Sequence, residues 1–363
     1  MTRVKIIGAG SIGNHLAHAA RRKDWSVTVC DISAAALERM RREIYPGRYG
    51  QWDEQIQLFE SAKAPRGEFD LICIGTPPDS HVSLALAALE EAPTAILVEK
   101  PLCPPSLEGA DQLLERARTS PTRVFVGYDH VVGRAIRKTE ALLRDGGIGA
   151  IKTIDVEFRE HWAGIFRAHP WLNGPEDSYL GFWQAGGGAS GEHSHAANLW
   201  QHLAHLTGAG PVVEVESRMA YVRDGKAWYD ELCYLTLQTS QGLLGRVVQD
   251  VVTTPTRKWA RIQGTEGAVE WICESPTRDV VRVLRPGQEP ETHELSKSRP
   301  DDFIDELSHI ESCWAAPAGT SPIALERGHD TMLVIAAAHQ SAAERRPVRV
   351  SLSAAHPVSG ASA

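Results

Sequence analysis

The sequence predicts an α/β domain with a parallel sheet, followed by an α+β domain with a large, mostly antiparallel, open-faced sheet. Short apolar runs alternate with helix-like segments as far as residue 127, as in a doubly wound parallel sheet. From residue 128 on, strand-like segments follow one another with few helices between them, which indicates antiparallel pairing. We therefore expect two domains, 1–127 and 128–363.

A glycine motif with the spacing G-x-G-x-x-G occupies residues 8–13. The motif alone is weak in a chain with 31 glycines, but its context is specific. Residues 4–7 are typical of a short buried strand, and residues 11–23 place apolar side chains at helical spacing. Strand, glycine turn and helix in this order predict a Rossmann dinucleotide-binding domain.

The glycines of this turn have separate physical tasks. Gly8 permits the tight turn, Gly10 lets the backbone approach a pyrophosphate, and Gly13 lets the helix pack close to the sheet. The phosphates are then expected at the helix N-terminus, beside Ser11 and Ile12.

The dinucleotide is predicted to be NAD rather than NADP. A second strand, 26–30, ends at Asp31, about 20 residues past the motif, where a carboxylate hydrogen-bonds the adenosine ribose. Asp31 would repel the 2′-phosphate of NADP, and Ile32 and Ser33 offer no guanidinium to hold one. Asp31 could also cap the helix expected over 34–42, and the two roles are compatible.

Further polar residues of the first domain follow its strands. More strands are expected over 69–75, 94–98 and 123–126, with helices over 81–91 and 107–118. Thr76, Pro77, Glu99 and Lys100 come directly after two of these strands. Ligands bind at the carboxyl ends of strands in such sheets, so we expect all four residues near the cofactor.

The second domain is expected to be a sheet with helices on one face. Strands are predicted over 151–161, 212–222, 230–239, 243–253, 258–264, 268–273 and 280–284, and helices over 135–144, 195–206, 303–314 and 325–345. An open face on a large sheet is usually covered. A second subunit is the simplest candidate, so we predict a homodimer or homotetramer.

Composition limits the partners and the compartment. A formal net charge of −8 gives no basic footprint for nucleic acid. No apolar run approaches the length of a membrane span and no apolar leader precedes the first strand, so we expect a cytoplasmic protein that does not bind membranes. The six cysteines are scattered singly and are expected to be reduced.

Several motifs together resemble the glucose-fructose oxidoreductase, inositol dehydrogenase and rhizopine-catabolism family, called Gfo/Idh/MocA, over nearly the whole chain. They are 8–13 with His15, 74–78 with His81, 99–102, 126–130, 186–188 leading to His195, and 264–267. The resemblance implies an NAD(P)-dependent oxidoreductase that acts on a hydroxyl-bearing carbon of a sugar, sugar acid, nucleotide sugar or cyclitol.

The resemblance also implies roles for two residues. Lys100 would hydrogen-bond the reacting hydroxyl, and His195 would accept its proton. The chemistry agrees, because imidazole can take a proton at neutral pH and an ammonium stabilises a developing alkoxide. The residues expected to bind the cofactor are Gly8, Gly10, Ser11, Ile12, Gly13, Asp31, Thr76, Pro77, His81, Glu99 and Lys100.

The segment before His195 departs from the family pattern. Relatives usually carry an Asp four residues before this His, and here that position is Gly191. Glu192 could take over its work on the imidazole or on a substrate hydroxyl, and His193 could be the acid-base group if the register shifts by a residue. Asn198 stands where relatives often have a second Asp, so it could contact substrate. The expected catalytic residues are Lys100, Glu192, His193 and His195.

A loop rich in aromatic residues, 161–183, precedes the glycine run. It suits a lid that stacks on a sugar ring and hydrogen-bonds its hydroxyls, although its tryptophans could instead fill a subunit interface. The residues expected to bind substrate are Lys100, Tyr128, His130, His161, Trp162, Trp171, Tyr179, Glu192, His195 and Asn198.

Clustered Glu and His side chains also allow a metal hypothesis. Its ligands would be Glu192, His193 and His195 with one of His161, His169 or His202. We expect no metal, because hydride chemistry needs none and the spacing matches no familiar zinc pattern.

Two alternative functions remain. One is an NAD-dependent glycosidase, epimerase or lyase that oxidises a ring carbon transiently, for which Glu192 and His193 would supply extra acid-base groups. The other is a non-catalytic NAD-dependent sensor, since fold does not fix function. The presence of both Lys100 and His195 argues against the sensor.

Overall fold

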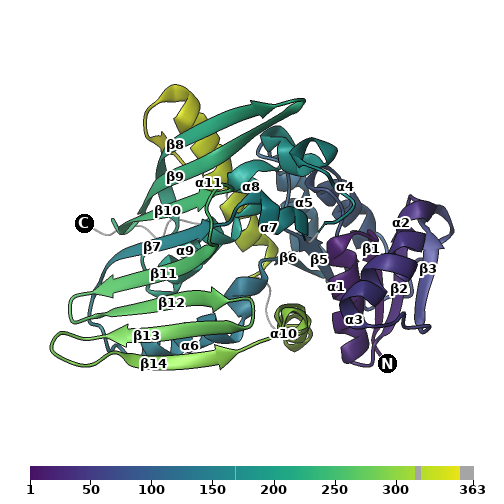
Figure 1. Ribbon diagram of the computed structural model, residues 1–363, viewed down its shortest axis with the longest axis horizontal. Coiled ribbons are helices and arrows are strands. Elements are labelled where there is room, and N and C mark those ends of the chain that lie inside the picture. Colours follow the sequence, from purple (N-terminus) through teal and green to yellow (C-terminus); the bar gives the residue numbers. More distant parts are fainter. Residues whose placement is uncertain (168, 315–319, 352–363) are drawn as a thin grey trace.

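The computed structural model describes residues 1–167, 169–314 and 320–351, with two sheets that lie side by side (Figure 1). The first sheet is parallel, in the order β3-β2-β1-β4-β5-β6. Its strands are β1 (Arg3–Ile7), β2 (Ser26–Asp31), β3 (Ile56–Glu60), β4 (Leu71–Ile74), β5 (Ala95–Glu99) and β6 (Arg123–Gly127). The predicted doubly wound parallel sheet is confirmed.

Helices α1 (Ser11–Arg22), α4 (Pro78–Leu89) and α5 (Ala110–Thr119) connect these strands. The helix expected over 34–42 is α2 (Ala34–Arg39), which continues into a π-helical turn, Met40–Ile44, and α3 (Tyr45–Tyr49). The Ser33 hydroxyl accepts a hydrogen bond from the Ala36 amide and caps α2, so Asp31 is not the cap. The edge strand β3 was not predicted, because it is short and only its first residue is fully buried.

The second sheet is mostly antiparallel, in the order β14-β13-β12-β11-β7-β10-β9-β8-β15, and only β7 and β10 pair in parallel. Its strands are β7 (Ile151–Arg159), β8 (Val212–Asp224), β9 (Ala227–Thr239), β10 (Leu244–Asp250), β11 (Arg257–Gly264), β12 (Ala268–Ser275), β13 (Arg278–Leu284), β14 (Glu291–Ser296) and β15 (Val348–Arg349). The predicted mostly antiparallel sheet is confirmed, with β14 and β15 added at its edges.

Helices cover one face of this sheet. The helix α9 (His195–Leu206) packs on β7 and β10, α6 (Arg134–Arg144) on β12 and β13, and α11 (Leu325–Glu344) on β8. On β9, Cys233 and Leu235 are buried toward the helices, whereas Tyr234 points away and is 41% exposed. Figure 1 views the opposite face, where no helix lies in front of the strands.

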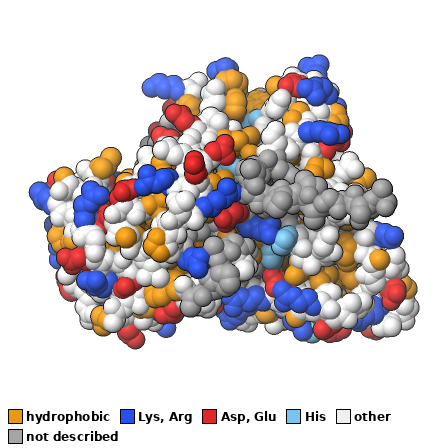
Figure 2. All heavy atoms as spheres, turned by 180° about the vertical axis from the view of Figure 1, so that it is seen from behind, with side chains coloured by type: hydrophobic (Ala, Val, Ile, Leu, Met, Phe, Trp, Pro, Cys, Tyr) orange, Lys and Arg blue, Asp and Glu red, His pale blue; other side chains and the backbone are white. Residues whose placement is uncertain are grey.

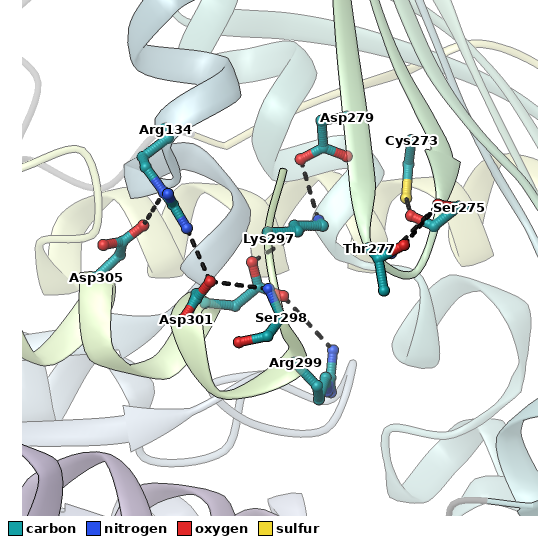
Figure 3. A network of polar contacts seen from close by, with 11 residues as sticks. Arg134, Cys273, Ser275, Thr277, Asp279, Lys297, Ser298, Arg299, Asp301 and Asp305 are labelled. Carbon is teal, nitrogen blue, oxygen red and sulfur yellow. Dashed lines mark hydrogen bonds and ion pairs between the residues drawn. The ribbon is translucent and has the colours of Figure 1, made fainter. Parts of the chain in front are cut away.

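The helix α10 (Arg299–Ser312) lies between the two sheets and packs against α1. Figure 3 shows how polar contacts fix its N-terminus: Arg134 pairs with Asp301 at 2.9 Å and with Asp305 at 3.4 Å, and Lys297 pairs with Asp279 at 3.0 Å. Ser298 and Asp301 form a capping box. The helix is therefore held where its middle turn, at Glu306, faces the space between the sheets.

The surface visible in Figure 2 carries charged side chains of both signs, and the cysteines form no disulfide bond. On the face in Figure 2, Lys and Arg side chains are interspersed with Asp and Glu side chains. All six cysteines are free. None of the helices within the described ranges has both the length and the apolar character needed to cross a bilayer.

Candidate active site

A cavity of about 530 Å³ lies between the carboxyl ends of the parallel strands and the second sheet. Its walls come from both domains. Ser11 and Ile12, at the start of α1, line the wall beside the glycine turn. His193 and His195 line the wall that belongs to the second domain. Lys100, directly after β5, lines the same space.

The glycine turn has the geometry that a dinucleotide needs. Gly8 has a φ of +109°, and a Cβ there would lie 2.7 Å from the Gly75 carbonyl oxygen. A Cβ on Gly13 would lie 1.9 Å from the Gly8 carbonyl oxygen, so both positions exclude any side chain. Around Gly10 there is no heavy atom within 4 Å of a Cβ position. Open space at the N-terminus of α1 fits a pyrophosphate.

Asp31 is fixed at the end of β2 beside this turn. Its two carboxylate oxygens accept hydrogen bonds from the Ala9 and Ser33 amides, each at 2.8 Å. Arg48 in α3 donates to the carbonyl and hydroxyl oxygens of Ser11 at 2.9 and 2.8 Å. Arg48 was not predicted from the sequence. The fold places it beside Ser11, where the phosphates are expected.

The sequence predicted that His81 binds the cofactor, and the structure contradicts this prediction. Its ring is fully buried, with Nδ1 2.9 Å from the Pro101 carbonyl oxygen and Nε2 2.7 Å from the Thr76 carbonyl oxygen. It braces the loops that follow β4 and β5 and cannot touch a ligand in the cavity. Thr76 and Pro77 lie at the start of α4, where the Thr76 hydroxyl is 2.7 Å from that of Ser80.

Lys100 is anchored to the second domain by Glu192. Its Nζ donates to the Glu192 carbonyl oxygen at 2.9 Å and lies 3.2 Å from a carboxylate oxygen of the same residue. Burial alone would raise the pKa of Glu192, but the charge and the hydrogen bond of Lys100 lower it below its usual value. Glu192 is therefore ionised, and its carboxylate contacts the lysine rather than His195.

Aromatic rings hold His195 in place. The rings of Tyr128 and His130 meet it edge-on, with centroids 5.5 and 4.7 Å away, and Phe158 lies 6.2 Å away. Burial, reinforced by the charges of Lys100 and Lys258, lowers the pKa of His195 well below its usual value. The imidazole is therefore neutral, which is the form that a proton acceptor requires.

The carboxylate beside His195 is Asp129, a residue for which sequence reasoning gave no role. Its Oδ1 lies 3.7 Å from Nδ1 of His195, and neither atom has a hydrogen-bond partner among the described residues. At Gly191, the position where relatives carry Asp, a Cβ would lie 2.0 Å from the Gly186 carbonyl oxygen. No side chain fits there, so the carboxylate reaches the imidazole from the end of β6 instead.

His193 is a second buried imidazole on the cavity wall. It is 3% exposed, and its Nε2 has no hydrogen-bond partner within the described ranges. Burial lowers its pKa to about 4, so it is neutral as well. The geometry therefore leaves both His193 and His195 available as proton acceptors.

Several predicted substrate residues lie outside the cavity. Asn198 is buried and donates to the Thr331 hydroxyl at 3.0 Å, and Tyr128 is fully buried behind His195. The other residues that do not line it are His161, Trp162, Trp171 and Tyr179. Their aromatic loop instead packs on the protein itself, because such rings bury more surface against neighbours than a polar cavity offers.

The loop still reaches the first domain. The guanidinium of Arg39 lies over the Trp171 ring, 5.3 Å from its centroid, and His169 lines the cavity. Lys100, His130, Glu192 and His195 are the predicted substrate residues that line it. Residues that line it without having been predicted as substrate-binding include Phe158, Glu160, His169 and Lys258. Phe158 and Lys258 come from strands whose sequence shows only ordinary alternation, whereas His169 comes from the aromatic loop.

The residues that could hold a metal ion in the structure differ from those predicted from the sequence. Among the described residues, the His and acidic groups with side-chain atoms within 4.8 Å of one another are Asp129, His130 and His195, not the set built on Glu192 and His193. An ion there would occupy the imidazole that the chemistry needs as a base, so our prediction of metal-free chemistry stays a prediction.

Comparison with known families decides the class of protein. The family described as oxidoreductase family, NAD-binding Rossmann fold, matches residues 2–128, and the GFO/IDH/MocA C-terminal domain matches residues 136–270. This chain belongs to the Gfo/Idh/MocA oxidoreductase family. It is thus an NAD-dependent oxidoreductase, and the open turn at Gly10 fits that cofactor. A comparison with curated proteins finds no match.

Solved structures share the fold at low sequence identity. An NAD-binding oxidoreductase from Klebsiella pneumoniae is 17% identical with a TM-score of 0.77, over 96% of this chain and 99% of that one. Levoglucosan dehydrogenase in complex with NADH and levoglucosan is 18% identical with a TM-score of 0.77, over 97% and 99%. The WlbA dehydrogenase from Bordetella pertussis, in complex with NADH and UDP-GlcNAcA, is 19% identical with a TM-score of 0.70, over 97% and 99%.

The contact at Gly191 predicts that even a methyl group is costly there. Because a Cβ would strike the Gly186 backbone, we expect Gly191→Ala to lower the free energy of unfolding by about 2 kcal/mol or more. Gly47→Ala, in a helix with no atom within 4 Å, should leave it within about 1 kcal/mol. Urea denaturation of both variants measures this. Equal stability of the two would contradict the contact.

The position of Asp31 predicts the choice of cofactor. Asp31→Ala should weaken NAD binding about tenfold and relax the discrimination against NADP, because the ribose loses an acceptor and the 2′-phosphate loses a repelling charge. Titration calorimetry with both cofactors measures it. The charge-matched control Glu38→Gln, in α2, should change neither affinity. An unchanged preference in Asp31→Ala would move selectivity elsewhere.

Proposed function

We propose that this protein is a reversible NAD-dependent dehydrogenase that oxidises a secondary hydroxyl of a sugar, sugar acid, nucleotide sugar or cyclitol. The observation that carries the proposal is the meeting of Lys100 and a neutral His195 in the cavity that also contains the start of α1. An amine, a proton acceptor and a dinucleotide turn in one space supply what alcohol oxidation requires.

The residues divide the work of the reaction. NAD, when bound, accepts the hydride from the carbinol carbon. Lys100 donates a hydrogen bond to the hydroxyl oxygen, where negative charge develops, and His195 takes the hydroxyl proton, so the alcohol leaves as a ketone. Glu192 keeps the amine of Lys100 pointed into the cavity, and Asp129 stabilises the imidazolium that His195 becomes. In the reverse direction His195 returns the proton.

The carbohydrate assignment is supported by the lining and by relatives. Glu160, His169 and Lys258 give the cavity donors and acceptors for several hydroxyls. The levoglucosan dehydrogenase and WlbA structures hold a sugar or a nucleotide sugar with NADH in the same fold.

A second candidate is transient oxidation, as in an NAD-dependent glycosidase, epimerase or lyase. The observation that favours it is the second buried neutral imidazole, His193, since elimination or inversion needs an additional acid-base group. Such an enzyme would return the hydride and release no NADH.

Absorbance at 340 nm with NAD and a panel of polyols, aldoses, sugar acids, nucleotide sugars and aryl glycosides tests the proposal. We expect net NADH with a ketone product. Lys100→Met should lower turnover about a thousandfold while NAD affinity changes little, because the substitution keeps the bulk and removes the donor. NAD-dependent cleavage without NADH would establish the second candidate. Full turnover in Lys100→Met would contradict the proposed role.

We also propose that the open face of the second sheet pairs with another copy of the chain. Tyr234 and Arg246 line the same hollow on this face, and Arg246 pairs with Asp155 at 3.0 Å, so the face combines charged groups with an exposed aromatic ring. Light scattering should give a dimer or tetramer mass, reduced in Tyr234→Glu but not in Thr119→Glu on α5. A monomer mass for the wild type would exclude the pairing.

A further inference from the structure

Three acidic side chains converge on one wall of the active-site cavity. Glu99 ends β5, Asp129 follows β6, and Glu306 lies in the middle of α10, so segments far apart in the sequence supply them. All three line the cavity that Ser11 and Lys100 also line. We call Glu99, Asp129 and Glu306 the carboxylate wall.

The carboxylate wall lacks the partners that buried acids normally have. Glu306 is 0% exposed, and neither of its carboxylate oxygens has a hydrogen-bond partner among the described residues. One oxygen each of Glu99 and Asp129 is also buried without a hydrogen bond among the described residues, and that of Asp129 lies 3.7 Å from Nδ1 of His195. Buried carboxylates without donors are costly. Four unpartnered acceptor oxygens beside one cavity therefore indicate a ligand group that is positive or rich in donors.

The cations near the wall each have another partner. Lys100 is held by Glu192, Lys297 by Asp279 and Asp302, and Arg299 lies over Phe303 and near Asp302. Among the histidines, burial keeps His15 and His130 neutral, with pKa values lowered to about 2 and about 3. Where the acids of the wall are ionised, they add negative charge to the cavity, which the charges of Lys100 and Arg299 offset only in part.

We propose that the carboxylate wall selects the oxidised cofactor by matching the positive charge of its nicotinamide ring. The inference rests on the proposed function and deepens it. Ser11, where the phosphates are expected, the carboxylate wall, and the pair Lys100 and His195 all line one cavity, so a nicotinamide ring bound beside Lys100 would share that cavity with the wall. The ring carries a positive charge in NAD⁺ and none in NADH, so the wall stabilises the oxidised form alone.

Protonation of the wall couples this preference to pH. Burial first, and then the charge of Asp129, raises the pKa of Glu99 to about 8, and burial with Glu99 and Asp129 raises that of Glu306 well above its usual value. Other groups that act on the wall are Lys100 after β5, Arg299 and Asp302 on α10, and His130 and His195 from the second domain. A bound cation favours the ionised acids. NAD⁺ affinity should therefore rise with pH through the range around 8, whereas NADH affinity should not.

Equilibrium binding to the full-length protein tests the proposal without any substrate. Dissociation constants for NAD⁺, NADH and ADP-ribose are measured by calorimetry from pH 6 to 9, with EDTA present so that no metal ion occupies the wall. ADP-ribose lacks the nicotinamide and reports on the rest of the site. In the wild type we expect NAD⁺ to bind more tightly as pH rises, with the other two ligands unaffected.

The variant Glu306→Gln keeps the shape of the side chain and removes its charge. We expect it to weaken NAD⁺ about tenfold at pH 9, where the wild-type wall is most ionised, and to leave NADH and ADP-ribose within about twofold. The matched control is Glu311→Gln on the same helix, whose carboxylate pairs with Lys23 at 3.0 Å near the surface. That control should change none of the three affinities.

The outcomes separate the two proposals. If NAD⁺ and NADH respond equally to pH and to Glu306→Gln, the wall does not select the oxidised ring, while dehydrogenase function stands. If neither dinucleotide binds, both proposals fall. If Glu306→Gln does not fold, the pH series on the wild type still decides, because it needs no substitution.

Discussion

The ion pair between Lys100 and Glu192 joins the two domains at the point where the chemistry takes place. Lys100 follows a strand of the parallel sheet, and Glu192 precedes the helix that covers the second sheet. The side chains are 13% and 20% exposed, so the pair is shielded enough for its attraction to matter. Its position fixes where an amine can meet a substrate, and the cavity forms around it.

Charge balance explains much of the rest of the site. Burial and nearby cations lower the pKa values of His193 and His195, so these imidazoles are neutral. Burial and mutual repulsion raise the pKa values of Glu99 and Glu306, which favours their protonated forms. Such a site is poised to accept one proton from a substrate and to favour one charge state of a cofactor. The ion pairs of Lys297 and Arg134 fix the position of α10, so Glu306 stays at the carboxylate wall (Figure 3).

Much of the fold was predictable because its signals are local. The glycine turn, the end of β2 at Asp31 and the alternation along β9 are each readable from neighbouring residues. The site was less predictable because it depends on contacts across the chain. Nothing near Asp129 in the sequence shows that it faces His195, and the crowding at Gly191 comes from a backbone oxygen five residues earlier that only the three-dimensional turn brings close.

The same limit explains the aromatic loop. Aromatic residues predict a large buried contact but not its partner, and Trp171 finds Arg39 of the first domain rather than the cavity. His81 shows the converse, since a motif residue beside the cofactor strands has its ring fully occupied by backbone carbonyls. Motifs thus predicted which segments surround the site. They did not predict the direction of each side chain, because packing decides that direction.

We propose that Lys100 and His195 act on a carbinol carbon whose hydride passes to NAD in this cavity. The most direct measurement uses a substrate deuterated at that carbon and mass spectrometry of the cofactor after a single turnover. We predict that deuterium appears on the cofactor and that Lys100→Met abolishes its appearance while NAD still binds. Formation of the ketone without deuterium on the cofactor would contradict this transfer.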